Sequence, residues 1–178
     1  MTIQKVATAM KRVVAVLERR PQVGLHDDTS ASALWEGGLR IATSHANGEV
    51  IFTDMPSELG GSGDRISPGW LFRAGLASCL ATCVAMRAAA AGIELSTLSV
   101  EATSRSDSRG LLGVPGADGE PVNAGPSEIQ LRVRLSARGV SDDRLRSLVD
   151  EGHRCSPVPA AVQHANPVVV HVEVDPMV

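Results

Sequence analysis

The sequence predicts an α+β fold, and three observations support that prediction. Residues 128–136 alternate strictly between apolar and polar side chains, which is typical of an antiparallel strand with one buried face. Asn47-Gly48 separates two short apolar runs and indicates a β-hairpin. Ser67-Pro68 precedes a long apolar stretch, which indicates the start of a buried helix. We expect one helix, three strands, a long helix, two strands, two helices and a final strand, without an internal repeat.

The first element is an amphipathic helix that ends before Pro21. Its apolar side chains recur at helical spacing, at Ile3, Val6, Met10, Val13 and Leu17. We expect this helix to cover a core or a subunit interface. A polar linker with His26, Asp27 and Asp28 follows. We therefore divide the chain into 1–30, an N-terminal helical extension and linker, and 31–178, the main domain.

Three strands should follow the linker. They are expected around Leu34-Trp35, over 39–44 and over 49–53. The turn between the last two is expected to need a positive φ at both Asn47 and Gly48. A glycine-rich loop then leads to the long helix, which should run to about Ala91 and stop at Gly92.

The second half of the chain should add two strands, two helices and a closing strand. We expect strands over 98–106 and 128–136, separated by a mobile loop at 108–126 that holds five glycines and three prolines. Ser141 should cap a helix that runs to about Arg154. The remaining elements are expected to be a short helix over 157–164 and a strand over 168–174.

Composition excludes several classes of function. The chain of 178 residues is 43% hydrophobic and 21% charged, which is a globular composition. Aromatic residues are only 2%, too few for a platform that stacks single-stranded nucleic acid. A net charge of −3 gives no broad attraction to phosphate backbones or anionic lipid. We expect neither nucleic acid nor membrane as a partner.

The chain is expected to work in the cytoplasm. Its first twenty residues carry charges throughout and do not resemble a secretory signal. The longest uncharged apolar run, 74–86, is too short to span a bilayer. Cytoplasmic thiols stay reduced, so the three cysteines should be free, catalytic or metal-binding.

Two of these cysteines, Cys79 and Cys83, lie one helical turn apart on the long helix. They are either small apolar core residues or part of a thiol site. A reactive thiol needs a lowered pKa, because the thiolate is the nucleophile. Cys79 is well inside its own helix, so a nearby cation, an arginine above all, would have to supply that effect.

A metal site formed by the three cysteines and His153 is a third interpretation. The spacing of the cysteines is not that of a structural zinc knuckle, and we expect no metal and no cofactor. The sequence has no glycine-rich phosphate loop, nucleophile elbow or zinc-protease motif.

Several motifs together resemble the OsmC/Ohr family of osmotically induced and organic-hydroperoxide-resistance proteins. They are, in chain order, Trp35-Glu36-Gly37, Glu58-Leu59-Gly60-Gly61, Ser67-Pro68, LFRAGLASC at 71–79, Arg109-Gly110-Leu111-Leu112-Gly113 and Ser156-Pro157-Val158. The resemblance runs from about Trp35 to Val174 and makes 31–178 an OsmC-like domain.

The resemblance implies an intertwined homodimer in which antiparallel sheets wrap long central helices, with the active site at the subunit interface. It also implies a peroxidase that reduces small organic hydroperoxides and protects against oxidative stress. Cys79 matches the attacking cysteine, which becomes a sulfenic acid. A second cysteine captures it as a disulfide, and a dithiol donor reduces that bond. By position, Arg40 is the arginine that stabilises the thiolate.

This chain departs from the family pattern at two places. Gly69 and Trp70 occupy the helix start where the family has a glutamate that holds the arginine. The second cysteine normally stands directly before Pro-Val, where this chain has Ser156, and Cys155 comes one residue earlier. Cys83 is a substitute for the second cysteine, although a disulfide to Cys79 inside one helix would be strained.

Two functions remain open from the sequence. The first is a thiol-dependent organic hydroperoxide reductase with catalytic residues Cys79, Cys155 and Arg40. The second is a non-catalytic relative that binds small apolar or electrophilic molecules at the dimer interface.

Overall fold

The computed structural model describes residues 3–176 and has the expected α+β composition. Its elements are α1 Ile3–Arg19, the 3-10 turn η1 Pro21–Gly24, β1 Ala31–Gly37, β2 Arg40–His45, β3 Val50–Thr53, the 3-10 turn η2 Ser57–Leu59, α2 Pro68–Ala90, β4 Leu95–Arg105, α3 Ser108–Leu112, β5 Ser127–Ala137, α4 Asp142–Arg154 and α5 Pro157–Gln163.

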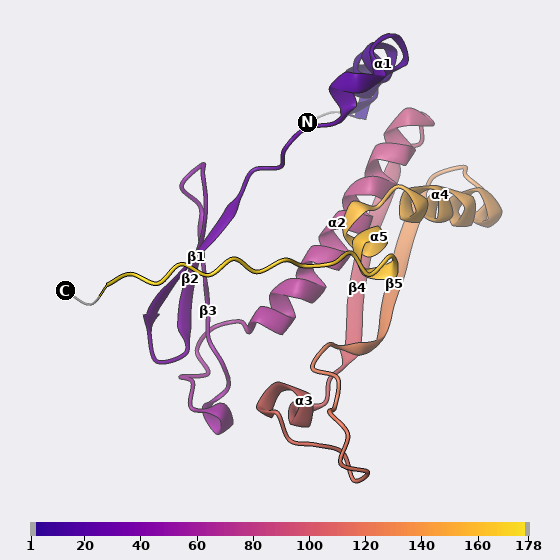
Figure 1. Ribbon diagram of the computed structural model, residues 1–178. Coiled ribbons are helices and arrows are strands. Elements are labelled where there is room, and N and C mark those ends of the chain that lie inside the picture. Colours follow the sequence, from indigo (N-terminus) through magenta and orange to yellow (C-terminus); the bar gives the residue numbers. More distant parts are fainter. Residues whose placement is uncertain (1–2, 177–178) are drawn as a thin grey trace.

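The strands form two separate antiparallel sheets. One has the order β1-β2-β3, and the other pairs β4 with β5. Figure 1 shows the three-stranded sheet standing apart from α2, to which the loop after β3 connects it. The β4–β5 sheet lies along α2, and α4 and α5 contact the same helix. The chain therefore consists of a helical core with one covering sheet, and a second sheet beside it.

The hairpin at Asn47-Gly48 is confirmed, but the expected turn geometry is wrong. Gly48 has a φ of 93°, whereas Asn47 does not have a positive φ. The Asn47 side chain accepts a hydrogen bond from the Glu49 N–H at 3.0 Å, and the Gly48 N–H donates to the His45 carbonyl at 3.0 Å. The connection is thus longer than a two-residue turn, and one glycine in the left-handed region is enough to close it.

The long helix α2 begins and ends where the sequence indicated. The Ser67 hydroxyl accepts a hydrogen bond from the Trp70 N–H at 3.2 Å, and Pro68 needs no acceptor in the first turn. Beyond the last turn, Gly92 adopts a φ of 68°. The side of α2 that faces β4, β5 and α4 forms the core through Leu76, Leu80, Val84 and Ala88.

Helix α4 comes unusually close to α2 near its own C-terminal end. A Cβ atom added at Gly152 would lie 2.7 Å from Val84 Cγ2 and 3.0 Å from Val84 Cα. Gly152 is buried and Val84 is fully buried. The absence of a side chain at position 152 is therefore what allows the two helices to touch.

Much of α2 has no partner within one chain. By length and composition it is the one helix of residues 3–176 that could cross a bilayer, a test that the core helices of soluble proteins also pass. Its contacts with β4, α4 and α5 identify it as a core helix. The opposite side, which includes Trp70 and Met86, is exposed.

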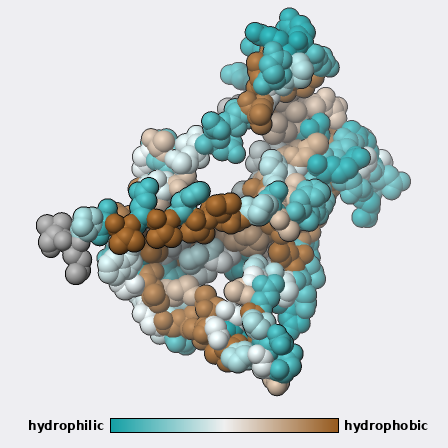
Figure 2. Space-filling model, viewed as in Figure 1, coloured by the Kyte–Doolittle hydropathy of each residue, from teal (hydrophilic) through white to brown (hydrophobic). Residues whose placement is uncertain are grey.

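The structure corrects two expectations about loops and strands. The segment 108–126 contains the short helix α3, capped by the Asp107 side chain, which accepts a hydrogen bond from the Arg109 N–H at 2.9 Å. The strand expected over 168–174 is absent, because the segment meets no strand edge in this chain. It leaves α5 as an extended segment (Figure 1), and its valines form a hydrophobic band on the surface (Figure 2).

Replacement of Gly152 by alanine tests the close contact of α4 with α2. Alanine improves helix propensity by up to about 1 kcal/mol, but its Cβ must displace Val84, at a cost of about 1–3 kcal/mol. We expect Gly152→Ala to lower the denaturant midpoint of unfolding. Gly69→Ala is the matched control, because a Cβ there meets only ordinary contacts at 3.8 Å and beyond. A midpoint for Gly152→Ala at or above that of the control would contradict the assignment.

Candidate functional site

The sulfur of Cys79 lies at the start of α5. The Val158 N–H points at Cys79 Sγ at a distance of 3.5 Å. Val158 is in the first turn of α5, where an N–H has no acceptor within its own helix. Cys79 is a free and partly buried thiol. The structure thus gives this sulfur a backbone N–H donor at the beginning of another helix, which the sequence did not reveal.

Cys83 lies one turn further along α2 than Cys79, and it is next to the third cysteine, Cys155. The Cys83 thiol donates a hydrogen bond to the Cys155 carbonyl at 3.4 Å. Cys155 is exposed and ends α4, while Cys83 is partly buried. No thiol of the described residues is in a disulfide.

Position 156 carries a serine with a structural task. Ser156 is fully buried, and its hydroxyl donates to the Gly152 carbonyl at 3.0 Å. This hydrogen bond ties the start of α5 to the end of α4. Cys155, one residue earlier, is exposed. The thiol of Cys155 is therefore accessible, whereas the hydroxyl of Ser156, one residue later, is buried.

Arg40, at the start of β2, is held by carboxylates of the loop that follows β3. Its guanidinium donates to Asp54 at 3.2 Å, to the Ser62 hydroxyl at 2.8 Å, and to Asp64. Gly69 and Trp70 supply no carboxylate at the helix start, and Asp54 and Asp64 take that task. Within residues 3–176 of one chain, no hydrogen bond or ion pair joins Arg40 to Cys79.

Asp54 is the most buried acid of this cluster, with 4% of its surface exposed. Its pKa is lowered to about 2. The largest cause is the hydrogen bond from the Ser62 hydroxyl at 2.6 Å, followed by the Met55 N–H at 2.7 Å, and Arg40 contributes less. Asp54 is therefore an ionised group that fixes Arg40 and the loop 54–64 together.

The Arg109-Gly110 run is structural within one chain. The Arg109 side chain binds Asp107, which lowers the Asp107 pKa to about 2. A Cβ at Gly110 would lie 2.4 Å from the Asn123 carbonyl oxygen, so only glycine fits there. These contacts hold α3 against the following loop.

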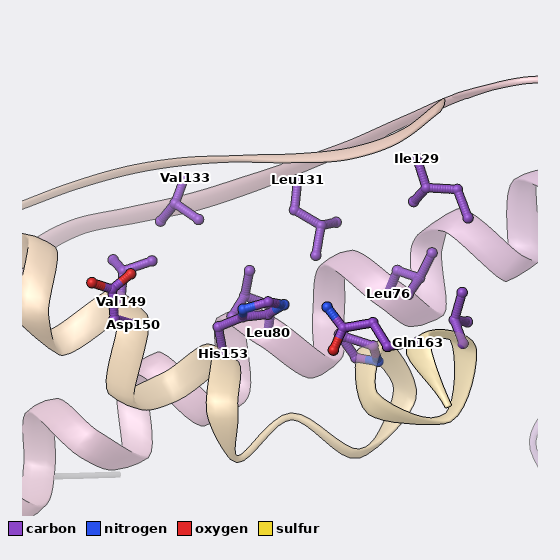
Figure 3. A pocket seen from close by; sticks show the side chains of 11 residues that line it. Leu76, Leu80, Ile129, Leu131, Val133, Val149, Asp150, His153 and Gln163 are labelled. Carbon is purple, nitrogen blue, oxygen red and sulfur yellow. The ribbon is translucent and has the colours of Figure 1, made fainter. Parts of the chain in front are cut away.

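An apolar groove of about 360 Å³ lies beside the thiols, between α2, β5, α4 and α5. Figure 3 shows His153, Asp150 and Gln163 as its polar members, while the remaining side chains are aliphatic. Its lining residues are Leu76, Leu80, Ile129, Leu131, Val133, Val149, Asp150, His153, Pro159, Val162 and Gln163. Cys79 does not line the groove, but its neighbour Leu80 and the residue after Val158 do.

Two of the three residues inferred from the sequence, Cys79 and Cys155, lie near the start of α5, but no hydrogen bond within the described residues joins them. Cys79 touches Val158, and Cys155 precedes that residue by three positions, whereas Arg40 lies on the separate sheet. No group of three or more His, Cys, Asp or Glu side chains within the described part is placed to hold a metal ion. The Val158 N–H and Asp54 were missed, since a backbone donor has no sequence signature and no local pattern pairs Asp54 with Arg40, 14 positions earlier.

The comparisons with known proteins agree on one family. The family model of OsmC-like proteins matches residues 61–171. None of the curated proteins matches the chain.

Solved structures of similar fold come from several bacteria. An organic hydroperoxide resistance protein OsmC from Legionella pneumophila is 24% identical, with a TM-score of 0.53 over 78% of this chain and 91% of that one. A putative organic hydroperoxide resistance protein from Vibrio cholerae, with captopril in one of its active sites, is 26% identical, with a TM-score of 0.53 over 78% and 88%. An OsmC-like protein from Mycoplasma pneumoniae is 17% identical, with a TM-score of 0.64 over 78% and 89%.

Replacement of Asp54 by asparagine tests the charge cluster. A carboxyl with a lowered pKa stabilises the fold above its unfolded pKa of 3.8, and this contribution is lost as pH falls towards about 2. We expect Asp54→Asn to melt at a lower temperature than the wild type at neutral pH. The difference should shrink between pH 4 and pH 2. Asp27→Asn, in the exposed linker, is the control, and its melting temperature should equal that of the wild type at every pH. An effect of Asp54→Asn that does not depend on pH would contradict a stabilising role of the ionised Asp54.

Proposed function

Because the chain belongs to the OsmC-like family, we propose that it is a thiol-dependent peroxidase that reduces organic hydroperoxides in the cytoplasm. The observation that supports this most is the position of Cys79 Sγ, 3.5 Å from a backbone N–H at the start of α5. A donor of this kind favours negative charge on sulfur, and the thiolate is the form that attacks peroxides. The names of the Legionella and Vibrio structures point to the same substrate class.

The proposed cycle uses two cysteines of this chain. The Cys79 thiolate attacks one peroxide oxygen, the O–O bond breaks, and the alcohol leaves after protonation. Cys79 is then a sulfenic acid, which condenses with the Cys155 thiol to a disulfide and releases water. A dithiol donor reduces that disulfide by exchange and restores both thiols.

We further propose that the working unit is a homodimer. The isolated chain exposes 13492 Å² of surface, whereas a folded monomer of this mass exposes about 8,000 Å². The excess of about 5,000 Å² per chain, or about 10,000 Å² for a pair, is at or above the upper end of the total area that obligate dimers cover. The open side of α2, the separate sheet and the C-terminal valines account for much of the exposed apolar surface. A partner that covers them would bring its own Arg40 to the thiol of Cys79.

The division of the chain fits this proposal. We assign residues 31–178 to an OsmC-like domain and residues 1–30 to a helical extension with a linker. Helix α1 precedes residues 61–171, which the family model matches, and it contacts α2. Val13 and Val14 of α1 remain exposed, which leaves an apolar strip available to a subunit interface.

A second candidate function is favoured by the apolar groove. A volume of about 360 Å³ is within the range of sites for small molecules. A chain that keeps the OsmC-like fold but has no peroxidase activity would bind small apolar or electrophilic molecules. The absence of a glutamate at Gly69 or Trp70 also fits this function, although Asp54 and Asp64 hold Arg40 in its place.

Hydroperoxide consumption separates the two functions. We expect the wild-type protein to remove cumene hydroperoxide with a dithiol as reductant, and Cys79→Ser to reduce this rate to that of the dithiol alone. Cys83→Ser is the matched control, one turn along the same helix, and should remain active. Consumption that is no faster with the wild type than with dithiol alone would exclude the peroxidase and leave the binding function.

Sedimentation velocity tests the dimer. We expect twice the chain mass of 18.6 kDa for the wild type. Val170→Lys places a charge among the exposed valines and should weaken the dimer at least about tenfold, because an unpaired charge would be buried at the interface. His171→Lys, on the other face of the segment, is the control. A monomeric wild type, or equal dimer strength in all three proteins, would contradict the proposal.

A further inference from the structure

The pairing of α2 with the end of α4 brings Cys83, and not Cys79, to Cys155. The Cys83 thiol donates to the Cys155 carbonyl at 3.4 Å. Cys79, one turn earlier, instead meets the Val158 N–H. The two contacts follow from the same helix packing, which continues from the tight approach of Gly152 to Val84. Cys155 therefore has the Cys83 thiol at its own backbone carbonyl.

The Cys83 sulfur lies close to the backbone of Cys155. A carbonyl oxygen lies about 2.4 Å from the Cα of its own residue, so Cys83 Sγ is within about 6 Å of the Cys155 Cα. A disulfide requires Cβ atoms about 3.5–4.5 Å apart, so the Cys155 side chain must turn towards Cys83 to form one. The Cys155 side chain is exposed and can rotate towards α2, and its N–H is anchored on the Gly152 carbonyl at 3.1 Å. Rotation of the Cys155 side chain towards α2 would thus bring its sulfur nearer to Cys83 Sγ.

We propose that Cys83 and Cys155 are a redox modification site that forms an intrachain disulfide by exchange with a low-molecular-weight disulfide. The exposed Cys155 attacks as a thiolate, forms a mixed disulfide and releases one small thiol. Cys83 loses its proton, attacks the Cys155 sulfur and releases the second small thiol. Two protein thiols are oxidised, one small disulfide is reduced to two thiols, and Cys79 takes no part.

This disulfide has a consequence for Cys79 that rests on the proposed function. Cys155 bound to Cys83 is not free to capture a sulfenic acid on Cys79. The bond also ties the end of α4 to α2 next to the Val158 N–H that contacts Cys79 Sγ. Oxidation of the pair would therefore stop the peroxidase cycle without occupying the attacking thiol.

Disulfide mapping of the full-length chain tests the pair without any peroxidase assay. Reduced protein is equilibrated with oxidised and reduced glutathione, blocked with N-ethylmaleimide, digested with trypsin and analysed by mass spectrometry. Cleavage after Arg73, Arg87 and Arg154 puts Cys79 and Cys83 in the peptide 74–87 and Cys155 in the peptide 155–178. In Cys79→Ser the only thiol of the peptide 74–87 is Cys83, so a link in this variant identifies the pair directly.

We expect the wild type and Cys79→Ser to yield the linked peptides and to migrate as single chains on a non-reducing gel. Cys83→Ser should yield at least about tenfold less of the link. Loss of the link in Cys79→Ser would overturn the proposal and assign Cys155 to Cys79. Absence of a link in the wild type, or a covalent dimer, would also overturn it. A protein that forms the link but consumes no hydroperoxide would refute the peroxidase and leave this pair standing.

Discussion

The contact between Gly152 and Val84 is the constraint on which the thiol site depends. Because position 152 has no side chain, α4 lies against α2 at backbone distance. The buried Ser156 hydroxyl continues this arrangement by binding the Gly152 carbonyl. Residues 155–158 are thereby placed along α2, with Cys155 at Cys83 and Val158 at Cys79. Close packing of two helices therefore decides the surroundings of all three thiols.

A second constraint acts on the separate sheet. Asp54 is nearly inaccessible and remains ionised because Ser62, Met55 and Arg40 donate hydrogen bonds to it. This network fixes Arg40 at a distance from Cys79 within one chain, on a sheet that has little core of its own. Two carboxylates of the loop after β3, Asp54 and Asp64, therefore fix the side chain of Arg40.

The chemistry available to the chain follows from these two arrangements. Cys79 has a backbone donor and partial exposure, which are the properties that a reactive thiol needs. Cys83 and Cys155 form a second pair of neighbouring thiols, of which the exposed one meets solvent first. The lining of the apolar groove includes Leu80 and Pro159, which directly follow Cys79 and Val158 in the sequence. The three thiols therefore lie around the junction of α4 and α5, where these helices pack on α2.

The sequence by itself determined most of the local structure. Periodicity, Ser67-Pro68, Ser141 and Gly92 located α2 and α4 to within a residue or two, because helix caps and apolar stripes are local signals. It also singled out Cys79. The turn at Asn47, the helix α3 and the unpaired segment 168–174 differ from expectation, since side-chain hydrogen bonds and missing partner strands have no local signature.

Only the tertiary structure decided which groups meet. The contact of Cys83 with Cys155, the Val158 donor at Cys79 and the acids around Arg40 join residues between 14 and 79 positions apart. Such contacts depend on how closely α4 can approach α2 and how the loop after β3 folds back. The sequence names the reactive residue types, and the packing of helices and loops selects their partners.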